Sequence, residues 1–330
     1  MHSIPPRSDT DTPLPQPAPL AAVTGATGFI GRHLLTALAH AGWRVRLLAR
    51  REPRVPDWEG LQPEVVPGSM HDESALERLV DGSDTIVHAA GLIRSPRRQT
   101  FFEVNTVATE RLARISCRIA PQAHFVLVST LAAREPHLSD YAASKRAGED
   151  AVRRLLGTRV TVLRPPAVYG PGDPETLRFF RIAASRIVPL PGPPQARAAL
   201  IHVQDLAQLL VALAAAEPTG KVWAAADARP QGYGWAEILG RAAQAVGNPN
   251  VRFVQAPGAL LRAIAWSGDC ARLFGTNAML NSQKLREVSH LDWSVAPAEQ
   301  AQPAGWTPRF GLAEGFADAV AWYRAARWLA

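Results

Sequence analysis

Tyr141 and Lys145 have a spacing that suits proton transfer, within the segment Tyr141-Ala142-Ala143-Ser144-Lys145. On a helix, residues i and i+4 lie on the same face, so these two side chains would be neighbours. A nearby ammonium favours the tyrosinate and would lower a phenol pKa that is about 10 in isolation. A tyrosine tuned in this way exchanges a proton with a hydroxyl or carbonyl oxygen near neutral pH. Taken alone, the spacing also fits a surface pair.

Two hydroxyl side chains, Ser129 and Thr130, end the apolar run at residues 124–129. If this run is a strand of a parallel sheet, both hydroxyls lie at the carboxyl edge, where such sheets bind ligands. A hydroxyl there can hydrogen-bond the oxygen of a reacting alcohol or carbonyl. Ser129 and Thr130 therefore join the tyrosine and the lysine as candidate catalytic residues, and the sequence indicates no metal-ligand cluster.

A glycine-rich turn follows the first apolar run and reads Thr24-Gly25-Ala26-Thr27-Gly28-Phe29-Ile30-Gly31. Glycines let backbone N–H groups approach a pyrophosphate closely, and the dipole of the following helix favours its negative charge. The spacing is GxxGxxG, and its place between a first strand and a first helix strengthens the signal. The turn predicts dinucleotide binding by Gly25, Thr27, Gly28, Phe29, Ile30 and Gly31, and the alternative is a purely structural turn.

The end of the second apolar run, Leu48-Ala49-Arg50-Arg51, bears on the choice of cofactor. Binders of NAD often place an acid at this point to accept a hydrogen bond from the ribose 2′-hydroxyl. Here the position offers arginines, which can pair with a 2′-phosphate. We therefore predict NADP(H) as the preferred cofactor and NAD(H) as the alternative. Arg50 and Arg51 would otherwise simply end the strand in solvent.

The elements that must position these residues alternate regularly through the first half of the chain. The expected strands are residues 20–24, 44–48, 64–67, 85–88, 124–129 and 159–163. The expected helices are residues 30–41, 73–80, 101–119 and 141–156. Such alternation with short connections predicts an α/β fold with a doubly wound parallel sheet of the Rossmann type. We assign this nucleotide-binding core to residues 20–165.

The second half, residues 166–330, is less regular and is interrupted by prolines. Helices are expected at residues 205–216, 236–246 and 312–329. This pattern suits a smaller, irregular substrate-binding region, with some elements returning to the core. Four tryptophans of this half are candidates for lining an apolar pocket, although core packing is their commoner role: Trp223, Trp235, Trp266 and Trp293.

Composition narrows the class of protein. The 330 residues carry 36 basic and 29 acidic side chains, and the basic ones are scattered, which argues against nucleic-acid binding. The two cysteines form no paired motif and suit a reducing, cytoplasmic compartment. Residues 1–19 are rich in proline and read as a disordered tail. No stretch is long and apolar enough to predict a transmembrane helix.

Taken together, the motifs resemble the extended branch of the short-chain dehydrogenase/reductase superfamily, also called the NAD-dependent epimerase/dehydratase family. The resemblance covers roughly residues 20–215 and follows the family's order. It rests on the glycine turn, His88-Ala89-Ala90-Gly91, Val104-Asn105, Val128-Ser129-Thr130, the tyrosine–lysine pair, the run Arg164-Pro165-Pro166-Ala167-Val168-Tyr169-Gly170-Pro171-Gly172-Asp173, and Ile201-His202-Val203-Gln204-Asp205.

The resemblance implies a role for each motif. Tyr141 would be the general acid/base, Lys145 would hold the nicotinamide ribose, and Thr130 would match the catalytic Ser/Thr with Ser129 as the fallback. Asn105 would support a proton relay. Two further groups would lie along the cofactor: His88, Ala89, Ala90 and Gly91 beside its length, and Pro165, Ala167 and Val168 at the nicotinamide. A homodimer through the helices at 101–119 and 141–156 is typical of the family.

Departures from the family pattern bear on the substrate. Ser69 stands where an acid often contacts adenine. Ala167 stands where sugar-nucleotide enzymes often place an asparagine, and Ala198 where they often place an arginine. These changes favour an NAD(P)-dependent reductase acting on an alcohol or carbonyl of a small, cyclic or apolar substrate. The alternatives are a nucleoside-diphosphate-sugar epimerase or dehydratase, and a non-catalytic assembly subunit whose final helix contacts a membrane or partner.

Overall fold

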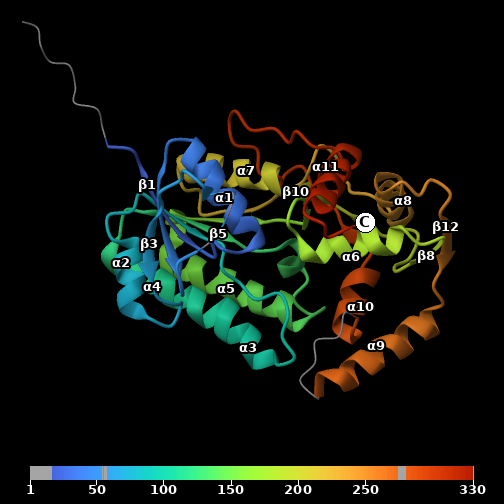
Figure 1. Cartoon of the computed structure of the whole chain (residues 1–330). Coiled ribbons are helices and arrows are strands. Elements are labelled where there is room, and N and C mark those ends of the chain that lie inside the picture. The colour runs from blue at the N-terminus through green and yellow to red at the C-terminus, as the bar shows by residue number, and fades with distance from the viewer. Residues whose placement is uncertain (1–16, 54, 56–57, 274–279, 330) are drawn as a thin grey trace, which may run out of the picture.

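The computed structural model describes residues 17–53, 55, 58–273 and 280–329 of the chain (Figure 1). Residues 1–16, most of the tail that we predict to be disordered, lie outside the described residues.

A seven-stranded parallel sheet forms the centre of the molecule. Its strand order is β11-β6-β5-β4-β1-β2-β3, so the chain winds outwards from β1 in both directions. This order confirms the predicted doubly wound α/β fold. The strands are β1 (Leu20–Thr24), β2 (Arg44–Ala49), β3 (Glu64–Pro67), β4 (Thr85–His88), β5 (His124–Val128), β6 (Val160–Arg164) and β11 (Val222–Ala224).

Helices cover both faces of this sheet, which explains why its strands are apolar on both sides (Figure 1). One face packs against α1 (Phe29–His40) and α7 (Val203–Ala215), around Val23 and Val87. The other face packs against α2 (Glu73–Val80), α4 (Ala108–Ile119) and α5 (Asp140–Leu156), around Ala22 and Ile86. Both α7 and β11 come from the second half of the chain, although they complete the sheet layer.

The helix expected at residues 101–119 is less regular than its pattern predicts. It begins earlier, as α3 (Arg98–Phe102), and continues through a π-helical turn at Glu103–Val107 before α4. A π-turn inserts an extra residue into the helical ladder and is frequent at functional sites. Here the inserted turn contains Asn105.

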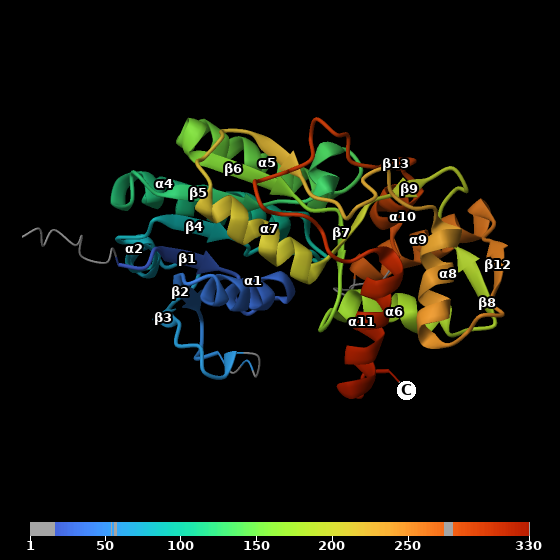
Figure 2. The same cartoon turned by 90° about the horizontal axis from the view of Figure 1, so that it is seen from above.

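The remaining elements build a smaller region beyond the carboxyl edge of the sheet (Figure 2). Its core packs Tyr169, Phe180, Phe316 and Tyr323 between three helices. The helices of the region are α6 (Pro174–Ala183), α8 (Trp235–Val246), α9 (Gly258–Leu273), α10 (Ser282–Ser289) and α11 (Leu312–Ala325). Its strands pair in parallel as β7 (Ala167–Tyr169) with β10 (Leu200–His202), β8 (Ile187–Leu190) with β12 (Arg252–Gln255), and β9 (Arg197–Ala198) with β13 (Asp292–Trp293).

One face of the final helix, α11, packs into the molecule. Its Tyr323 is fully buried, and the Tyr323 hydroxyl donates to the Asp173 carbonyl at 2.7 Å. Trp322 and Trp328 pack edge to face, with ring centroids 5.0 Å apart. These aromatic side chains therefore hold α11 against the molecule. No helix in the described part of the chain is long and apolar enough to cross a bilayer.

Candidate active site

The predicted site residues gather at the carboxyl edge of the sheet, because each follows the end of a different parallel strand. Gly25 follows β1, Ala89 follows β4, Thr130 follows β5 and Pro165 follows β6. These strands are consecutive neighbours in the order β6-β5-β4-β1. In doubly wound sheets, ligands bind at this edge, near the point where the winding reverses.

The glycine turn is shaped by contacts that admit no side chain. Gly25 has φ +74°, and a Cβ there would lie 2.5 Å from the Ala90 nitrogen. A Cβ on Gly31 would overlap the Gly25 carbonyl oxygen. Gly28 begins α1 with no side-chain cap, and the first turn of α1 contains no acidic residue. The N–H groups at a helix N-terminus have no intrahelical partners, so this uncapped turn can bind a pyrophosphate.

Arg50 directly follows β2, at the same edge of the sheet as the glycine turn. Arg50 and Arg51 are both exposed. Among the described residues, neither guanidinium has a hydrogen-bonding or ion-pair partner. The two arginines are therefore placed to receive an anionic group from solvent.

His88 is engaged inside the protein, so its side chain cannot line a bound cofactor. The ring hydrogen-bonds Thr24 through Nδ1 at 2.6 Å and Thr109 through Nε2 at 2.8 Å. Burial, with a further contribution from the charge of Lys145, lowers the His88 pKa to about 3. The neutral ring thus ties β1, β4 and α4 together. The partly exposed backbone of Ala89 and Ala90 remains available at the edge.

Asn105 holds the loop after β4 against α5. Its side-chain oxygen accepts from the Leu92 N–H at 2.7 Å, and its amide donates to the Leu92 carbonyl and to Ser144 Oγ, each at 3.0 Å. A Cβ placed on Gly91 would lie 3.4 Å from Asn105 Oδ1 and 3.6 Å from Lys145 Nζ. The side chains of Asn105 and Lys145 therefore both lie next to Gly91.

Tyr141 and Thr130 are hydrogen-bonded to each other through their side chains. Tyr141 lies in the first turn of α5, and its ring contacts that of Phe101 with centroids 6.3 Å apart. Burial raises the pKa of Tyr141 to about 12, a hydrogen bond with the Thr130 side chain lowers it, and the charge of Glu287 raises it. We expected a lowered Tyr141 pKa, and the net direction is the opposite, because burial of the phenol dominates. The phenol therefore keeps its proton near neutral pH.

Lys145 lies one helical turn beyond the tyrosine and is almost fully buried. Its ammonium donates to the Val128 carbonyl, the last residue of β5, at 2.8 Å. Burial lowers the Lys145 pKa to about 8, and the charge of Glu149 partly opposes this. The ammonium is held at the sheet edge, between Gly91 and the end of β5.

Ser129 does not share the environment of Thr130. Its hydroxyl donates to the buried carboxylate of Glu149, which also pairs with Arg164 on β6. Two of the guanidinium contacts measure 2.9 and 2.5 Å. Ser129 is thus part of a buried network that joins β5, α5 and β6. The sequence signal for Glu149 was its position four residues after Lys145, on the same helix face.

The helix α10 adds a contact to the catalytic helix that no local motif predicts. Ser139, the N-cap of α5, donates to Glu287 at 2.5 Å, and the Asp140 N–H donates to Gln283 at 2.9 Å. Because these partners are distant in sequence, only the folded chain brings Glu287 close enough to influence Tyr141.

The residues expected at the nicotinamide have different exposures. Pro165 is buried, and its carbonyl accepts from the Leu131 N–H at 2.7 Å. Ala167 is exposed and Val168 partly exposed, both on the short strand β7. The Ala167 side and the edge after β5 are therefore accessible, whereas Pro165 fixes the connection between them.

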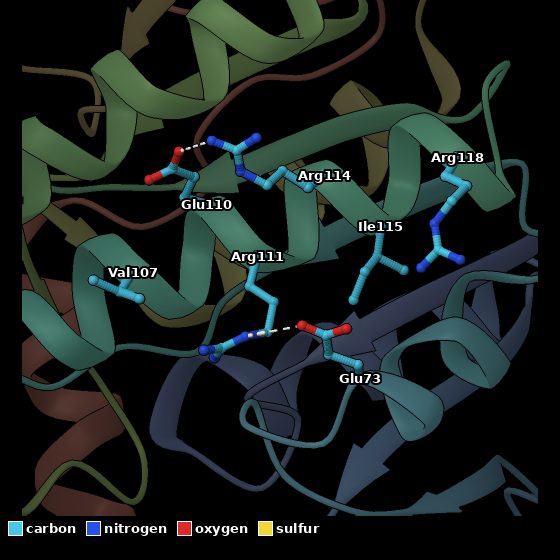
Figure 3. Close-up of a pocket in the computed structure, with 7 residues that line it drawn as sticks. All are labelled: Glu73, Val107, Glu110, Arg111, Arg114, Ile115 and Arg118. Atoms are coloured by element: carbon cyan, nitrogen blue, oxygen red, sulfur yellow. Dashed lines mark hydrogen bonds and ion pairs between the residues drawn. The ribbon is translucent and has the colours of Figure 1, made fainter.

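A surface hollow between α2 and α4 lies apart from these residues (Figure 3). Its arginines are paired with carboxylates: Arg114 with Glu110 at 2.6 Å, and Arg111 with Glu73 at 3.8 Å. The hollow contains none of the predicted site residues.

In the described part of the chain, no cluster of His, Cys, Asp and Glu side chains could hold a metal ion.

Comparison with known proteins decides the family. The sequence profile of the NAD dependent epimerase/dehydratase family matches residues 21–226, more than half of the chain. The chain belongs to this family. It is therefore an enzyme of the short-chain dehydrogenase/reductase superfamily that uses a nicotinamide cofactor. The match ends two residues after β11, so it covers the whole parallel sheet.

Relatives of the chain include a reductase of similar length. The "Ceramide reductase" of Caulobacter vibrioides is 45% identical over 315 residues, which cover 94% of this chain and 96% of the relative. Among solved structures, gox2253 superposes with a TM-score of 0.75 at 19% identity, covering 94% of this chain and 99% of the other. DesIV, a dTDP-glucose 4,6-dehydratase from Streptomyces venezuelae solved with NAD and TYD, gives 0.71 at 22% identity, with 94% and 98% coverage.

Two further motifs of this epimerase/dehydratase-family chain have structural roles in the fold. Tyr169 is fully buried, and its ring packs against that of Phe316 with centroids 4.9 Å apart. Asp205 accepts from the N–H groups of Arg309 and Phe310 at 3.0 and 2.9 Å, which anchors the segment before α11. Tyr169 therefore packs β7 against α11, and Asp205 fastens α7 to the segment that precedes α11.

The different surroundings of the two hydroxyls give a paired prediction. We expect Thr130→Ala to lower kcat by about 10- to 100-fold, because Tyr141 loses its hydrogen-bonding partner. We expect Ser129→Ala to leave kcat nearly unchanged and to cost about 1 kcal/mol of stability, because Glu149 loses one donor. Steady-state kinetics and thermal unfolding of both variants test this. A loss of kcat in Ser129→Ala alone would reverse the assignment.

The pKa of Lys145 predicts a pH limit for the enzyme. The ammonium loses its proton as the pH rises through about 8, so we expect kcat/KM to fall above that pH. Lys145→Arg keeps its charge at all these pH values, so its profile should stay flat across the same range, at a lower absolute rate. Initial rates between pH 6 and 10 in constant ionic strength would measure both. An identical fall in the arginine variant would assign the limit to another group.

Proposed function

We propose that this enzyme is an NADPH-dependent reductase that converts a ketone of a ceramide-class lipid to a secondary alcohol. The observation that carries this proposal is the 45% identity to a ceramide reductase over 94% of the chain. The Tyr141 phenol is hydrogen-bonded to Thr130 and keeps its proton near neutral pH, so it is present in the form that can donate a proton to a ketone oxygen.

The residues present fit a dinucleotide. The uncapped N-terminus of α1 receives the pyrophosphate, and the tight packing of Gly25 and Gly31 keeps that turn open to it. Arg50 and Arg51 bind the 2′-phosphate, which makes NADP(H) the preferred form. Lys145 holds the nicotinamide ribose, and the segment after Pro165 flanks the ring. Reduced nicotinamide supplies a hydride when it is bound.

The chain's own residues complete the reduction. Thr130 and Tyr141 hydrogen-bond the ketone oxygen and orient the carbonyl carbon towards the nicotinamide side of the site. As the ketone is reduced, its oxygen would gain negative charge, and the Tyr141 hydroxyl would transfer its proton to that oxygen. The product is the alcohol, and Tyr141 is left as tyrosinate. The ammonium of Lys145 stabilises this developing negative charge until the tyrosine is reprotonated.

The substrate class rests on two supports. A relative that is 45% identical over 94% of the chain is named a ceramide reductase. In addition, Ala167 and Ala198 replace the asparagine and arginine that would favour a sugar nucleotide, and Ala167 is exposed on β7. An apolar substrate with a single ketone next to an amide-bearing carbon needs no diphosphate-binding residues.

The two other functions make different demands on the site. A sugar-nucleotide epimerase or dehydratase needs donors for a diphosphate, which the alanines at 167 and 198 do not provide. An assembly subunit needs no acid/base pair, whereas this chain keeps Tyr141, Thr130 and Lys145 in one place. Both observations favour the reductase.

A reductase assay tests this proposal. Purified protein with NADPH and a 3-oxo-N-acyl amino lipid in detergent micelles should oxidise NADPH and yield the secondary alcohol, identified by mass spectrometry. The matched substrates are the same lipid already reduced and a UDP-sugar. Conversion of the UDP-sugar without net NADPH consumption would instead establish an epimerase. Absence of turnover with every carbonyl lipid, despite NADPH binding, would refute the substrate class.

We also propose that the enzyme is a homodimer through the outer faces of α4 and α5, as is typical of the family. Sedimentation velocity should give twice the mass of the 35.6 kDa chain. A monomeric mass at micromolar concentration would refute this.

A further inference from the structure

The exposed side of α9 is unusually apolar for a helix that faces solvent. The side chains of Leu260, Ile264 and Trp266 are 53%, 45% and 69% exposed. Ala259, Ala263 and Ser267 are also exposed, and these six positions cover roughly 160° of the helix circumference, from Ile264 at one margin to Trp266 at the other. We call the five apolar residues of this arc the α9 face. The opposite side of the helix carries the buried Ala265 and Gly268, so α9 is packed in place and its apolar residues point outwards.

The surroundings of the α9 face are positively charged. Arg262 lies at its edge and is exposed, and the sequence contains no carboxylate between Glu237 and Asp269. The preceding strand β12 adds the exposed Arg252, paired in register with Ile187 of β8, which is 61% exposed. Both views place β8, β12 and α9 at the end of the molecule remote from β3 (Figures 1 and 2).

We propose that the α9 face, with Arg262 at its edge and Arg252 on the preceding strand, is a docking surface for an anionic lipid bilayer. An exposed apolar helix face is a mark of an interaction site. Tryptophan and leucine on such a face insert at the headgroup boundary, while nearby arginines attract anionic lipids. An anionic bilayer is the favoured occupant because the exposed apolar side chains are accompanied by arginines, with no carboxylate in the sequence between Glu237 and Asp269.

The docking surface is linked to the catalytic helix through one intervening helix. Asp269 of α9 accepts from the Ser282 N–H at the start of α10, at 3.2 Å. The next residue of α10, Gln283, accepts from the Asp140 N–H at the start of α5. These two contacts connect the docking surface, through α10, to the end of α5 that carries Tyr141. The inference that docking lets the enzyme take its substrate from the membrane rests on the proposed function. The inference that the α9 face binds a membrane does not depend on it.

Vesicle binding tests the docking surface without any substrate. The full chain should sediment with vesicles containing phosphatidylglycerol and much less with pure phosphatidylcholine vesicles. Leu260→Ser/Ile264→Ser/Trp266→Ser should lower this partitioning by at least about 100-fold, since it removes most of the inserted apolar area. Val107→Ser, which changes an exposed apolar residue on the π-helical turn, should bind like the wild type.

A second pair of variants tests the charge. Arg252→Gln/Arg262→Gln should weaken binding to the anionic vesicles by about 30-fold and change binding to phosphatidylcholine little, since each cation near such a surface contributes about 1 kcal/mol. The matched control is Arg153→Gln/Arg154→Gln at the exposed end of α5. Equal losses in both pairs would show attraction by net charge alone and would overturn a localised surface.

Other results separate this proposal from its alternatives. If the wild type ignores anionic vesicles, or the triple variant still binds them, the α9 face does not dock to membranes. If the triple variant instead loses an oligomer that the wild type forms in sedimentation velocity, the face binds a second copy of the chain. Reductase activity in detergent micelles, which needs no docking, should survive in the triple variant. Vesicle binding without any lipid reduction would refute only the proposed substrate.

Discussion

Tyr141→Phe should lower kcat by about 10²- to 10⁴-fold while NADPH binding stays unchanged. The substitution removes only the phenolic oxygen, so the ring contact with Phe101 persists and the proton donor is lost. Without that donor, the ketone oxygen must take its proton from water as the hydride arrives. Single-turnover oxidation of NADPH with saturating lipid substrate measures the chemical step directly. Titration of NADPH fluorescence measures binding in the same preparation.

Tyr169→Phe is the matched control for this experiment. Tyr169 is fully buried, and its hydroxyl reaches the Gly311 carbonyl only at 3.5 Å, so it contributes little beyond packing. We expect this variant to keep its turnover rate. A Tyr141→Phe enzyme that keeps more than about a tenth of the wild-type rate would contradict general acid catalysis by Tyr141.

The sheet could be predicted closely because local pattern and global fold agree there. The bounds of β1, β3, β4 and α2 coincide with the expected ranges. The signals for β1 and β4 are continuous apolar runs flanked by turns, whereas that for β3 is weaker. The start of α2 is marked by Asp72, the N-cap, whose side chain accepts from the Ala75 N–H. The glycine turn and the pair Tyr141 and Lys145 were found for the same reason, because spacing within one element determines their positions.

Predictions failed where tertiary contacts override the local pattern. One miss has a local cause instead: the prolines after Arg164 suggested broken chain, although Asp173 and Pro174 form a local helix-start signal for α6. The direction of the Tyr141 pKa depends on burial and on Glu287, which arrives from α10. The roles of Ser129 and His88 likewise depend on partners from other elements, Glu149 and Thr109.

The exposure of the tryptophans shows the same limit. Trp293 donates to the Glu287 carbonyl at 2.8 Å, and Trp235 stacks on Phe179 with ring centroids 6.4 Å apart. Trp266 faces solvent instead. Their residue type predicted an apolar environment for all of them, but only the packing of α9 determines that Trp266 points away from the protein. Whether a hydrophobic residue is exposed at the protein surface depends on its packing and cannot be predicted from composition.

Arg50→Ala should weaken NADPH binding by roughly 10- to 100-fold and leave NADH binding nearly unchanged. A charge-assisted hydrogen bond to a phosphate contributes about 1.5–3 kcal/mol, which corresponds to this range of Kd. Only NADPH carries the 2′-phosphate, so the loss should be selective. Because Arg50 is exposed and has no partner among the described residues, its removal leaves no buried group unsatisfied and should not change the fold.

Arg44→Ala is the matched control, since Arg44 is an exposed arginine at the opposite end of the same strand. Titration of nicotinamide fluorescence with each coenzyme gives four Kd values for each variant pair. A general loss of net charge would weaken NADPH binding equally in both variants, whereas a local phosphate contact affects only Arg50→Ala. Equal losses for NADH and NADPH in Arg50→Ala would place the arginine at a part of the coenzyme that both share. Tight NADH binding in the wild type, with weak NADPH binding, would make NAD(H) the working cofactor, and the exposed arginines would then have no role in its selection.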